Sequence, residues 1–207
     1  MNQRFANRVV LVTGAAGGLG RGFAEGFADE GATLVLTDVD AAGMEQTAER
    51  IREKGGRCSG HRLDLAVESD IQAFAAEVAG QHPQIDVLVN NAGLAYGEVA
   101  HAFEALNQAR WLHYLAINSV APLLLAQALR APLAQARGVV LNLSSMASYV
   151  PATAYGVTKA TLNAMTYGMA NVFAADGIRV NAIAPGLVET PASQAQLNDD
   201  TRAHIQG

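Results

Sequence analysis

The chain has 207 residues, of which 50% are hydrophobic and 16% charged, so its length and composition suit one domain with a substantial buried core. A formal net charge of −5 at pH 7, without any block of like charges, excludes the basic surface that nucleic-acid binding needs. No apolar run approaches the length of a membrane span and the N-terminus lacks the pattern of a signal peptide, so we expect a soluble cytoplasmic protein without membrane contact.

The first predicted element is a strand over residues 8–13 (RVVLVT), whose unbroken apolar run indicates burial on both faces. Four of the next seven residues are glycines: Gly14, Gly17, Gly18 and Gly20. A helical pattern over 18–31 follows directly, and the unpaired N–H groups and positive dipole end of such a helix favour a pyrophosphate above the turn. A purely structural glycine turn is the alternative for this motif taken alone.

The second predicted strand covers 32–38 and ends in Asp38, 18 residues after the last of these glycines. A dinucleotide fold places there the acid that binds the adenosine ribose hydroxyls, and a carboxylate repels the extra phosphate of NADP. The alternative is an N-cap for the helix predicted over 41–56. Asp64 closes a weaker third strand over 57–65 in the same way, with a loop acid or helix cap as its alternative.

Cysteine and histidine usage argue against a disulfide and a metal site. Cys58, in the third strand, is the only cysteine, which rules out an internal disulfide and suits a reducing compartment. The five histidines show no metal-ligand spacing, so we expect no metal and assign surface or packing roles to them.

Helices and strands continue to alternate along the rest of the chain. Helical patterns cover 68–82, 108–136 and 153–177, and strand patterns cover 86–93, 138–145 and 178–186. This alternation predicts βαβ units, an α/β fold with a parallel sheet covered by helices on both faces, and a single domain over residues 1–207. Such sheets bind their ligands beyond the carboxyl ends of the strands.

Three motifs together resemble the classical short-chain dehydrogenase/reductase family. TGAAGGLG at 13–20 is similar to the family's T-G-x-x-x-G-x-G turn, NNAG at 90–93 to its fourth-strand motif, and YGVTK at 155–159 to its Y-x-x-x-K pair. Order and spacing agree from about Arg8 to Thr190. The resemblance implies a Rossmann-like doubly wound sheet and an oxidoreductase that transfers a hydride between NAD(H) and a small-molecule alcohol or ketone.

The resemblance also implies which residues hold the NAD cofactor. By this similarity Asp64 and Leu65 contact the adenine, Asn90 and Gly93 border the adenosine ribose, and the segment 185–190 lies on the nicotinamide side. The full set of implied cofactor contacts is Gly14, Gly18, Leu19, Gly20, Asp38, Asp64, Leu65, Asn90, Ala92, Gly93, Tyr155, Lys159, Pro185, Gly186, Val188 and Thr190.

Tyr155 and Lys159 are the candidate catalytic pair, because a spacing of four residues puts them on one helix face. The lysine ammonium favours the phenolate form that acid/base work requires, although an ordinary surface pair is the alternative. Ser145 follows a predicted strand, where its hydroxyl can bond the substrate oxygen; Ser144 is the alternative. Asn118 by resemblance completes a tetrad and holds a water linked to the lysine, with a satisfied helix amide as its alternative.

Apolar residues by position suggest a mainly apolar substrate, with a core role as their alternative. The candidates on the substrate side are Leu94, Tyr96, Ala147, Tyr149 and Leu187. The chain departs from the family in two ways. The ten residues from Ser145 to Tyr155 are about three fewer than many members have, which suggests an open site, and the chain ends at Gly207, where the family continues. The usual C-terminal lid helix and last strand are therefore expected to be missing.

These residues predict an NAD-dependent alcohol dehydrogenase or ketone reductase. One alternative is an NADPH-dependent 3-oxoacyl reductase, which Asp38 and the lack of a basic residue at Gly17 disfavour. The other is a non-catalytic NAD-binding regulatory or scaffold protein. We further expect a homodimer, with a tetramer as the alternative, through the apolar helices around residues 111–129 and 153–174.

Overall fold

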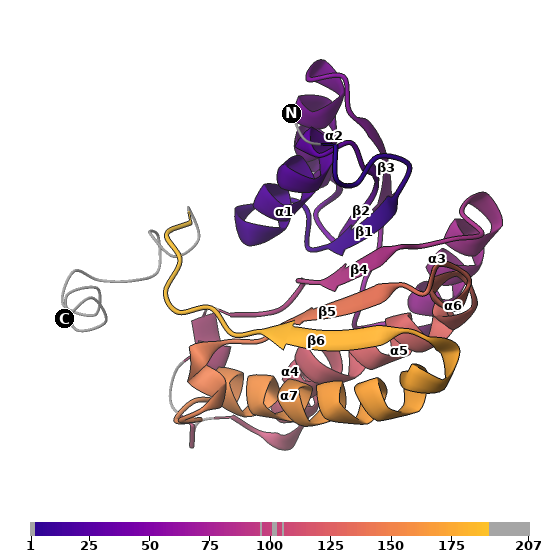
Figure 1. Cartoon of the computed structure of the whole chain (residues 1–207). Helices are drawn as coiled ribbons and strands as arrows, with labels where there is room; N and C mark the ends of the chain where they lie inside the picture. Colours follow the sequence, from indigo (N-terminus) through magenta and orange to yellow (C-terminus); the bar gives the residue numbers. More distant parts are fainter. Residues whose placement is uncertain (1–2, 96, 101–102, 105, 191–207) are drawn as a thin grey trace.

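One six-stranded parallel sheet, in the order β3-β2-β1-β4-β5-β6, forms the centre of the molecule (Figure 1). The computed structural model describes residues 3–95, 97–100, 103–104 and 106–190. The strands are β1 (Val9–Thr13), β2 (Thr33–Asp38), β3 (Arg57–Arg62), β4 (Val87–Asn90), β5 (Val139–Leu143) and β6 (Arg179–Ile183). The predicted parallel sheet is thus confirmed. The chain order reverses between β1 and β4, and such a reversal opens a crevice at the carboxyl ends of the strands.

Helices cover both faces of the sheet, as the alternation of elements predicts (Figure 1). α1 (Gly18–Asp29) and α2 (Ala41–Glu53) pack on the face that carries Val10 and Val12 of β1. α3 (Glu68–Gln81), α5 (Ala121–Ala128), α6 (Arg130–Ala136) and α7 (Ala154–Phe173) pack on the face that carries Leu11. Successive strand side chains point to opposite faces, so a strand between two helical layers needs a continuous apolar run.

The prediction of one continuous helix over 108–136 is wrong. This stretch is divided into α4 (Gln108–Leu115), a π-helical turn (Ala116–Val120), α5 and α6. Pro122 lacks the N–H that would bond to Asn118 in a regular α-helix, and widening the turn accommodates this loss. A bend of 66° then separates α6 from the rest of the element.

Within the described residues, no single helix has the length and apolar character needed to cross a membrane. The bent pair of segments Gln108–Ala128 and Arg130–Ala136 meets that test by length and composition only. Leu125 and Leu133 of these segments, and Leu129 between them, are buried in the core on the face of the sheet that carries Leu11.

Candidate functional site

A cavity of about 980 Å³ runs along the carboxyl ends of the six strands. Its walls come from the segment that follows each strand, from Thr13 after β1 to the loop 185–190 after β6. Ligand cavities in proteins fall in the range of roughly 300 to 1,000 Å³, so this one is large enough for an extended molecule. The cavity therefore joins groups that are far apart in the sequence into one site.

The glycine turn between β1 and α1 forms one wall of the cavity, and two of its glycines have no room for a side chain. Gly14 has φ +69°, and a Cβ there would lie 2.8 Å from Ala92 Cα. A Cβ on Gly20 would lie 1.9 Å from the carbonyl oxygen of Gly14. Both glycines allow α1 and the segment after β4 to approach the turn closely.

The N-terminus of α1 is open toward this cavity. Its N-cap is Gly17, which offers no side-chain hydrogen bond to the first turn, and a Cβ on Gly17 would meet nothing within 4 Å. The N-cap residue thus supplies no side-chain acceptor to the first N–H groups of the helix, which favours anion binding at this N-terminus. The turn, the open helix end and the length of the cavity fit a dinucleotide with its diphosphate above α1.

Asp38, at the end of β2, lines the cavity beside the glycine turn. Its Oδ2 accepts a hydrogen bond from Ala16 N at 2.9 Å, and its Oδ1 accepts one from Asp40 N at 3.0 Å. The N-cap of α2 is Asp40, whose side chain accepts from Gly43 N, so the N-cap alternative for Asp38 is wrong. Asp38 instead holds the backbone of the turn and presents a carboxylate to the cavity.

Lys159 lies at the other end of the cavity, next to Tyr155 on α7. Its side chain is buried, with 3% exposed, and Nζ donates to the carbonyl oxygen of Leu143 at 2.6 Å. Nζ lies 5.7 Å from the centre of the Tyr155 ring. Burial lowers the pKa of Lys159 to about 8, because the charged form loses hydration. The ammonium and the phenol thus share one end of the site, as their spacing predicts.

Both candidate serines follow β5 and line this end of the cavity. Ser145 Oγ accepts from Ala147 N at 3.2 Å, which leaves its own hydrogen available to a ligand. Ser144 is almost fully buried, and its hydroxyl is one of two buried side-chain oxygens without a partner among the described residues. The other is Thr37 Oγ1, at the Asp38 end of the same cavity.

Asn118 is fully buried in the π-helical turn and does not itself line the cavity. Its Oδ1 accepts from Leu94 N at 2.8 Å, and its Nδ2 donates to Leu94 O and to Thr158 Oγ1, both at 3.0 Å. A Cβ on Gly93 would lie 3.2 Å from Asn118 Oδ1 and 3.4 Å from Lys159 Nζ, so the amide and the lysine flank the same glycine. The side chain of Asn118 ties the segment after β4 to α7.

The structure brings most of the predicted site residues to the cavity, but not all. Those that line it are Gly14, Gly18, Leu19, Gly20, Asp38, Asp64, Leu65, Ala92, Gly93, Leu94, Ser145, Ala147, Tyr155, Lys159, Pro185, Gly186, Leu187, Val188 and Thr190. Tyr149 does not line it and is 73% exposed. Tyr96 lies outside the described residues.

Asn90 is also placed away from the cavity. It is buried below the edge, where its Nδ2 donates to Asn142 Oδ1 at 2.8 Å and to Pro122 O at 3.3 Å. The neighbouring Asn91, which the sequence analysis did not single out, lines the cavity and donates from Nδ2 to Thr13 O and Gly14 O. Consecutive side chains at a strand end point in opposite directions. The two adjacent asparagines in NNAG could therefore have indicated that only one of them faces the cavity.

Arg21 and Ala16 are further cavity residues that the sequence analysis missed. Within the described part of the chain, no group of three or more His, Cys, Asp or Glu side chains is arranged to hold a metal ion. Fold and site together define the class: a doubly wound α/β protein with a dinucleotide-type cavity and a tyrosine and buried lysine at its far end.

Comparison with known proteins agrees with this class. The family model described as short chain dehydrogenase matches residues 8–201. The chain is 37% identical to cis-4-hydroxycyclohexanecarboxylate dehydrogenase of Sinomonas cyclohexanicum over 98% of its own length and 82% of that protein. It is 33% identical to 2-dehydro-3-deoxy-D-gluconate 5-dehydrogenase of Bacillus subtilis (strain 168), over 94% and 76% of the two chains. The chain therefore belongs to the short-chain dehydrogenase family.

Solved structures show the same likeness. A metagenomic short-chain oxidoreductase in complex with NADP has 32% identity and a TM-score of 0.81, over 89% of this chain and 84% of that one. L-sorbose reductase from Gluconobacter frateurii, complexed with NADPH and L-sorbose, has 30% identity and a TM-score of 0.86, over 93% and 74%. The family and its neighbours support an oxidoreductase that uses a nicotinamide dinucleotide.

Proposed function

We propose that this protein is an NAD-dependent alcohol dehydrogenase or ketone reductase, with residues 1–207 forming one catalytic domain. The observation that carries the proposal is the single cavity that joins Asp38 at one end to Ser145, Tyr155 and Lys159 at the other. A cytoplasmic location is part of the proposal and is supported by the free thiol of Cys58. The substrate is a small alcohol or ketone.

In the proposed reaction, Tyr155 exchanges a proton with the substrate oxygen. Lys159, buried within 5.7 Å of the phenol ring, favours the charged oxygen of Tyr155 during this exchange. Ser145 donates a hydrogen bond from its hydroxyl to the same substrate oxygen. This hydrogen bond strengthens as negative charge develops on the oxygen. The nicotinamide ring, when bound, supplies the hydride acceptor or donor.

Asn118 supports the proposed site from behind. Its amide holds both backbone groups of Leu94, at the edge of the cavity, and the hydroxyl of Thr158, next to Lys159. These bonds fix the segment after β4 relative to the first turns of α7. We also propose that Asn118 holds a water linked to Lys159, as the family resemblance implies.

The substrate end is lined mainly by apolar groups, which favour an apolar alcohol. Leu94, Met146, Ala147 and Leu187 line the cavity near the proposed catalytic residues. The test is a panel of secondary alcohols with purified protein and NAD, followed by NADH absorbance. We expect NADH to form with at least one alicyclic or aliphatic member. Tight NAD binding without turnover on the whole panel would favour a scaffold protein instead.

Cofactor preference is the first specific prediction. The carboxylate of Asp38 can accept the ribose hydroxyls of NAD but lies as a like charge beside the extra phosphate of NADP. Asp38→Ala is expected to shift the ratio of NADH to NADPH affinity toward NADPH by about 10- to 100-fold, the effect of one or two charged hydrogen bonds. Fluorescence titration with both cofactors measures the two Kd values.

The two Kd values also distinguish an NAD-dependent enzyme from the alternative, an NADPH-dependent reductase. That alternative is favoured by the NADP and NADPH bound in the two similar structures. Asp64→Ala is the matched control: Asp64 also lines the cavity, and because we assign it to the adenine, which NAD and NADP share, its loss should leave the ratio of the two affinities unchanged. Wild-type protein that binds NADPH as well as NADH would contradict the assignment of Asp38.

Homodimer formation through α4 and α7 is the second prediction. Among the apolar residues of these two helices, Leu112 of α4 is 58% exposed, whereas Met169 of α7 is 2% exposed and belongs to the core. Tyr167, also on α7, is 74% exposed and adds to the apolar surface. An interface must cover such side chains to gain stability from them. We expect light scattering at micromolar concentration to give twice the mass of the chain.

Leu112→Glu and Tyr167→Glu place a charge on this surface and are expected to shift the dimer toward monomer. Val67→Glu, at an exposed apolar position before α3, is the matched control and should leave the mass unchanged. A monomeric wild-type protein would contradict the dimer, and a dimer indifferent to both substitutions would contradict its location.

A further inference from the structure

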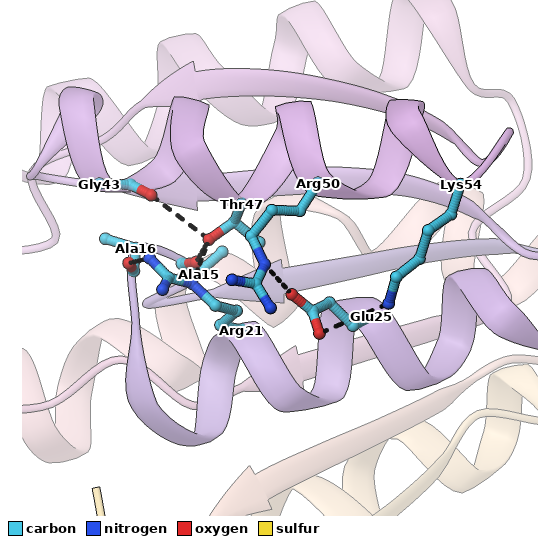
Figure 2. Close-up of polar contacts among 8 residues, drawn as sticks. All are labelled: Ala15, Ala16, Arg21, Glu25, Gly43, Thr47, Arg50 and Lys54. Carbon is cyan, nitrogen blue, oxygen red and sulfur yellow. Dashed lines mark hydrogen bonds and ion pairs between the residues drawn. The ribbon is translucent and has the colours of Figure 1, made fainter. Parts of the chain in front are cut away.

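Two side chains behind the glycine turn hold its carbonyl groups (Figure 2). Arg21 of α1 donates from Nη2 to Ala16 O at 2.6 Å and from Nε to Thr47 Oγ1 at 3.0 Å. Thr47 of α2, which is fully buried, donates from Oγ1 to Ala15 O at 2.8 Å, with Gly43 O at 3.3 Å as a second acceptor. One arginine and one threonine thus join two helices to two consecutive carbonyls of the turn.

The N–H groups of the same two residues are held from the opposite side. Ala15 N donates to Thr37 O at 3.2 Å, and Ala16 N donates to Asp38 Oδ2 at 2.9 Å. The backbone of residues 15 and 16 is therefore fully bonded on both sides. Its orientation is set by β2, α1 and α2 together.

This bonding also orients the next peptide group. The chain has no cis peptide bond among the described residues, and in a planar trans peptide the carbonyl and the following N–H point in opposite directions. Because Ala16 O points to Arg21, the N–H of Gly17 points away from Arg21. A Cβ on Gly17 would also meet nothing within 4 Å. The positive charge of Arg21 lies directly beside this turn and lines the cavity.

Close packing of α2 makes these bonds possible. A Cβ on Gly43, in the first turn of α2, would lie 3.0 Å from Ala16 Cβ and 3.2 Å from Ala16 O. The absence of that side chain lets α2 bring Thr47 within hydrogen-bond distance of the turn. The N-terminal part of α2, which contains Gly43 and Thr47, is therefore the part of the helix that contacts the glycine turn.

We infer that Arg21 and Thr47 are positioning residues for the adenosine diphosphate part of the cofactor, acting through the backbone of Ala15 to Gly17. The inference rests on the proposed use of a nicotinamide dinucleotide. Neither side chain needs to touch the ligand. Arg21 fixes the peptide that carries the N–H of Gly17. Thr47 fixes the preceding peptide, whose N–H donates to Asp38. Loss of either bond frees a carbonyl of the turn and lets the peptide rotate, so the affinity for the diphosphate falls while the groups around Tyr155 stay in place.

The test measures binding of NADH by fluorescence and of ADP-ribose by calorimetry, together with the melting temperature. Thr47→Val, which keeps the shape and removes the hydroxyl, and Arg21→Met are each expected to raise both Kd values about 10-fold. Thr47→Ser, which keeps the hydroxyl, should bind both ligands with near wild-type affinity. Arg21→Lys keeps the charge but cannot make both hydrogen bonds, so its Kd values should lie between those of wild type and Arg21→Met. At saturating cofactor, kcat should stay within about two-fold of wild type.

Arg50→Met is the matched control. Arg50 also joins α2 to α1, through Nε to Glu25 Oε1 at 2.6 Å (Figure 2). Among the described residues no hydrogen bond links Arg50 to the turn. We expect it to leave both Kd values unchanged whatever its effect on the melting temperature. An equal loss of affinity in Arg50→Met, or wild-type affinity in Thr47→Val and Arg21→Met, would overturn the inference alone. A wild-type protein that binds neither NADH nor NADPH would overturn the proposed function and the inference with it.

Discussion

Replacing Tyr155 with phenylalanine is expected to lower kcat by about 10²- to 10⁴-fold, the usual contribution of a general acid or base. The ring, which lies 5.7 Å from Lys159 Nζ, remains in place, so the cavity keeps its shape and only the ionisable oxygen is lost. The Kd for NADH should therefore stay within about two-fold of wild type. Turnover with the best alcohol of the panel and a fluorescence titration measure the two quantities.

The comparison of kcat with Kd separates a chemical role of Tyr155 from a structural one. Tyr167→Phe is the matched control, because Tyr167 belongs to the same helix and is 74% exposed away from the core. It should leave both quantities unchanged. Turnover by Tyr155→Phe within a few-fold of wild type would reject this tyrosine as the proton carrier.

Removing the buried charge of Lys159 is expected to change how stability depends on pH. Burial lowers the pKa of Lys159 from 10.5 to about 8, so between these pH values the unfolded chain holds the proton that the folded chain has lost. The free energy of unfolding contributed by Lys159 therefore rises with pH across that window, whereas below pH 8 the folded state must bury the full charge. The total change is on the order of 3 kcal/mol.

Lys159→Met removes this dependence, because a thioether does not titrate. The difference in unfolding free energy between wild type and Lys159→Met should move in favour of wild type as pH rises from 8 toward 10.5. Urea unfolding at a series of pH values measures it. Lys54→Met, at the exposed C-cap position directly after α2, is the control and should give a flat difference. A flat difference for Lys159→Met as well would show that the ammonium is not desolvated.

Much of the fold was predictable from local pattern. The apolar run of β1 buries Val10 and Leu11 on opposite faces, as a strand between two helical layers must. The glycines after β1 predicted a close approach, and Gly14 indeed has no room for a side chain. The spacing of Tyr155 and Lys159 predicted a shared helix face, and both line one end of the cavity.

The helical pattern over 108–136 shows what local spacing could not predict. The apolar spacing of 108–136 is helical throughout, but the structure divides this stretch into α4, a π-helical turn, α5 and α6, and both Pro122 and Pro132 lie within it. Pro122 removes one backbone donor, and the π-helical turn before it carries the buried Asn118 toward Leu94 and Thr158. Whether a proline bends or ends a helix depends on what packs around it, which no local spacing records.

What the sequence by itself determined was the set of strands and helices, the parallel sheet, and the residue types at the strand ends, because these depend on the periodicity of neighbours within one element. Only the tertiary structure decided that Asn91 rather than Asn90 faces the cavity, that Asp40 rather than Asp38 caps α2, and that Lys159 is buried. It also decided the contact of Arg21 with Thr47, 26 residues away in the sequence. Such contacts depend on the distance and angle at which two elements pack, and these are set by all the side chains between them.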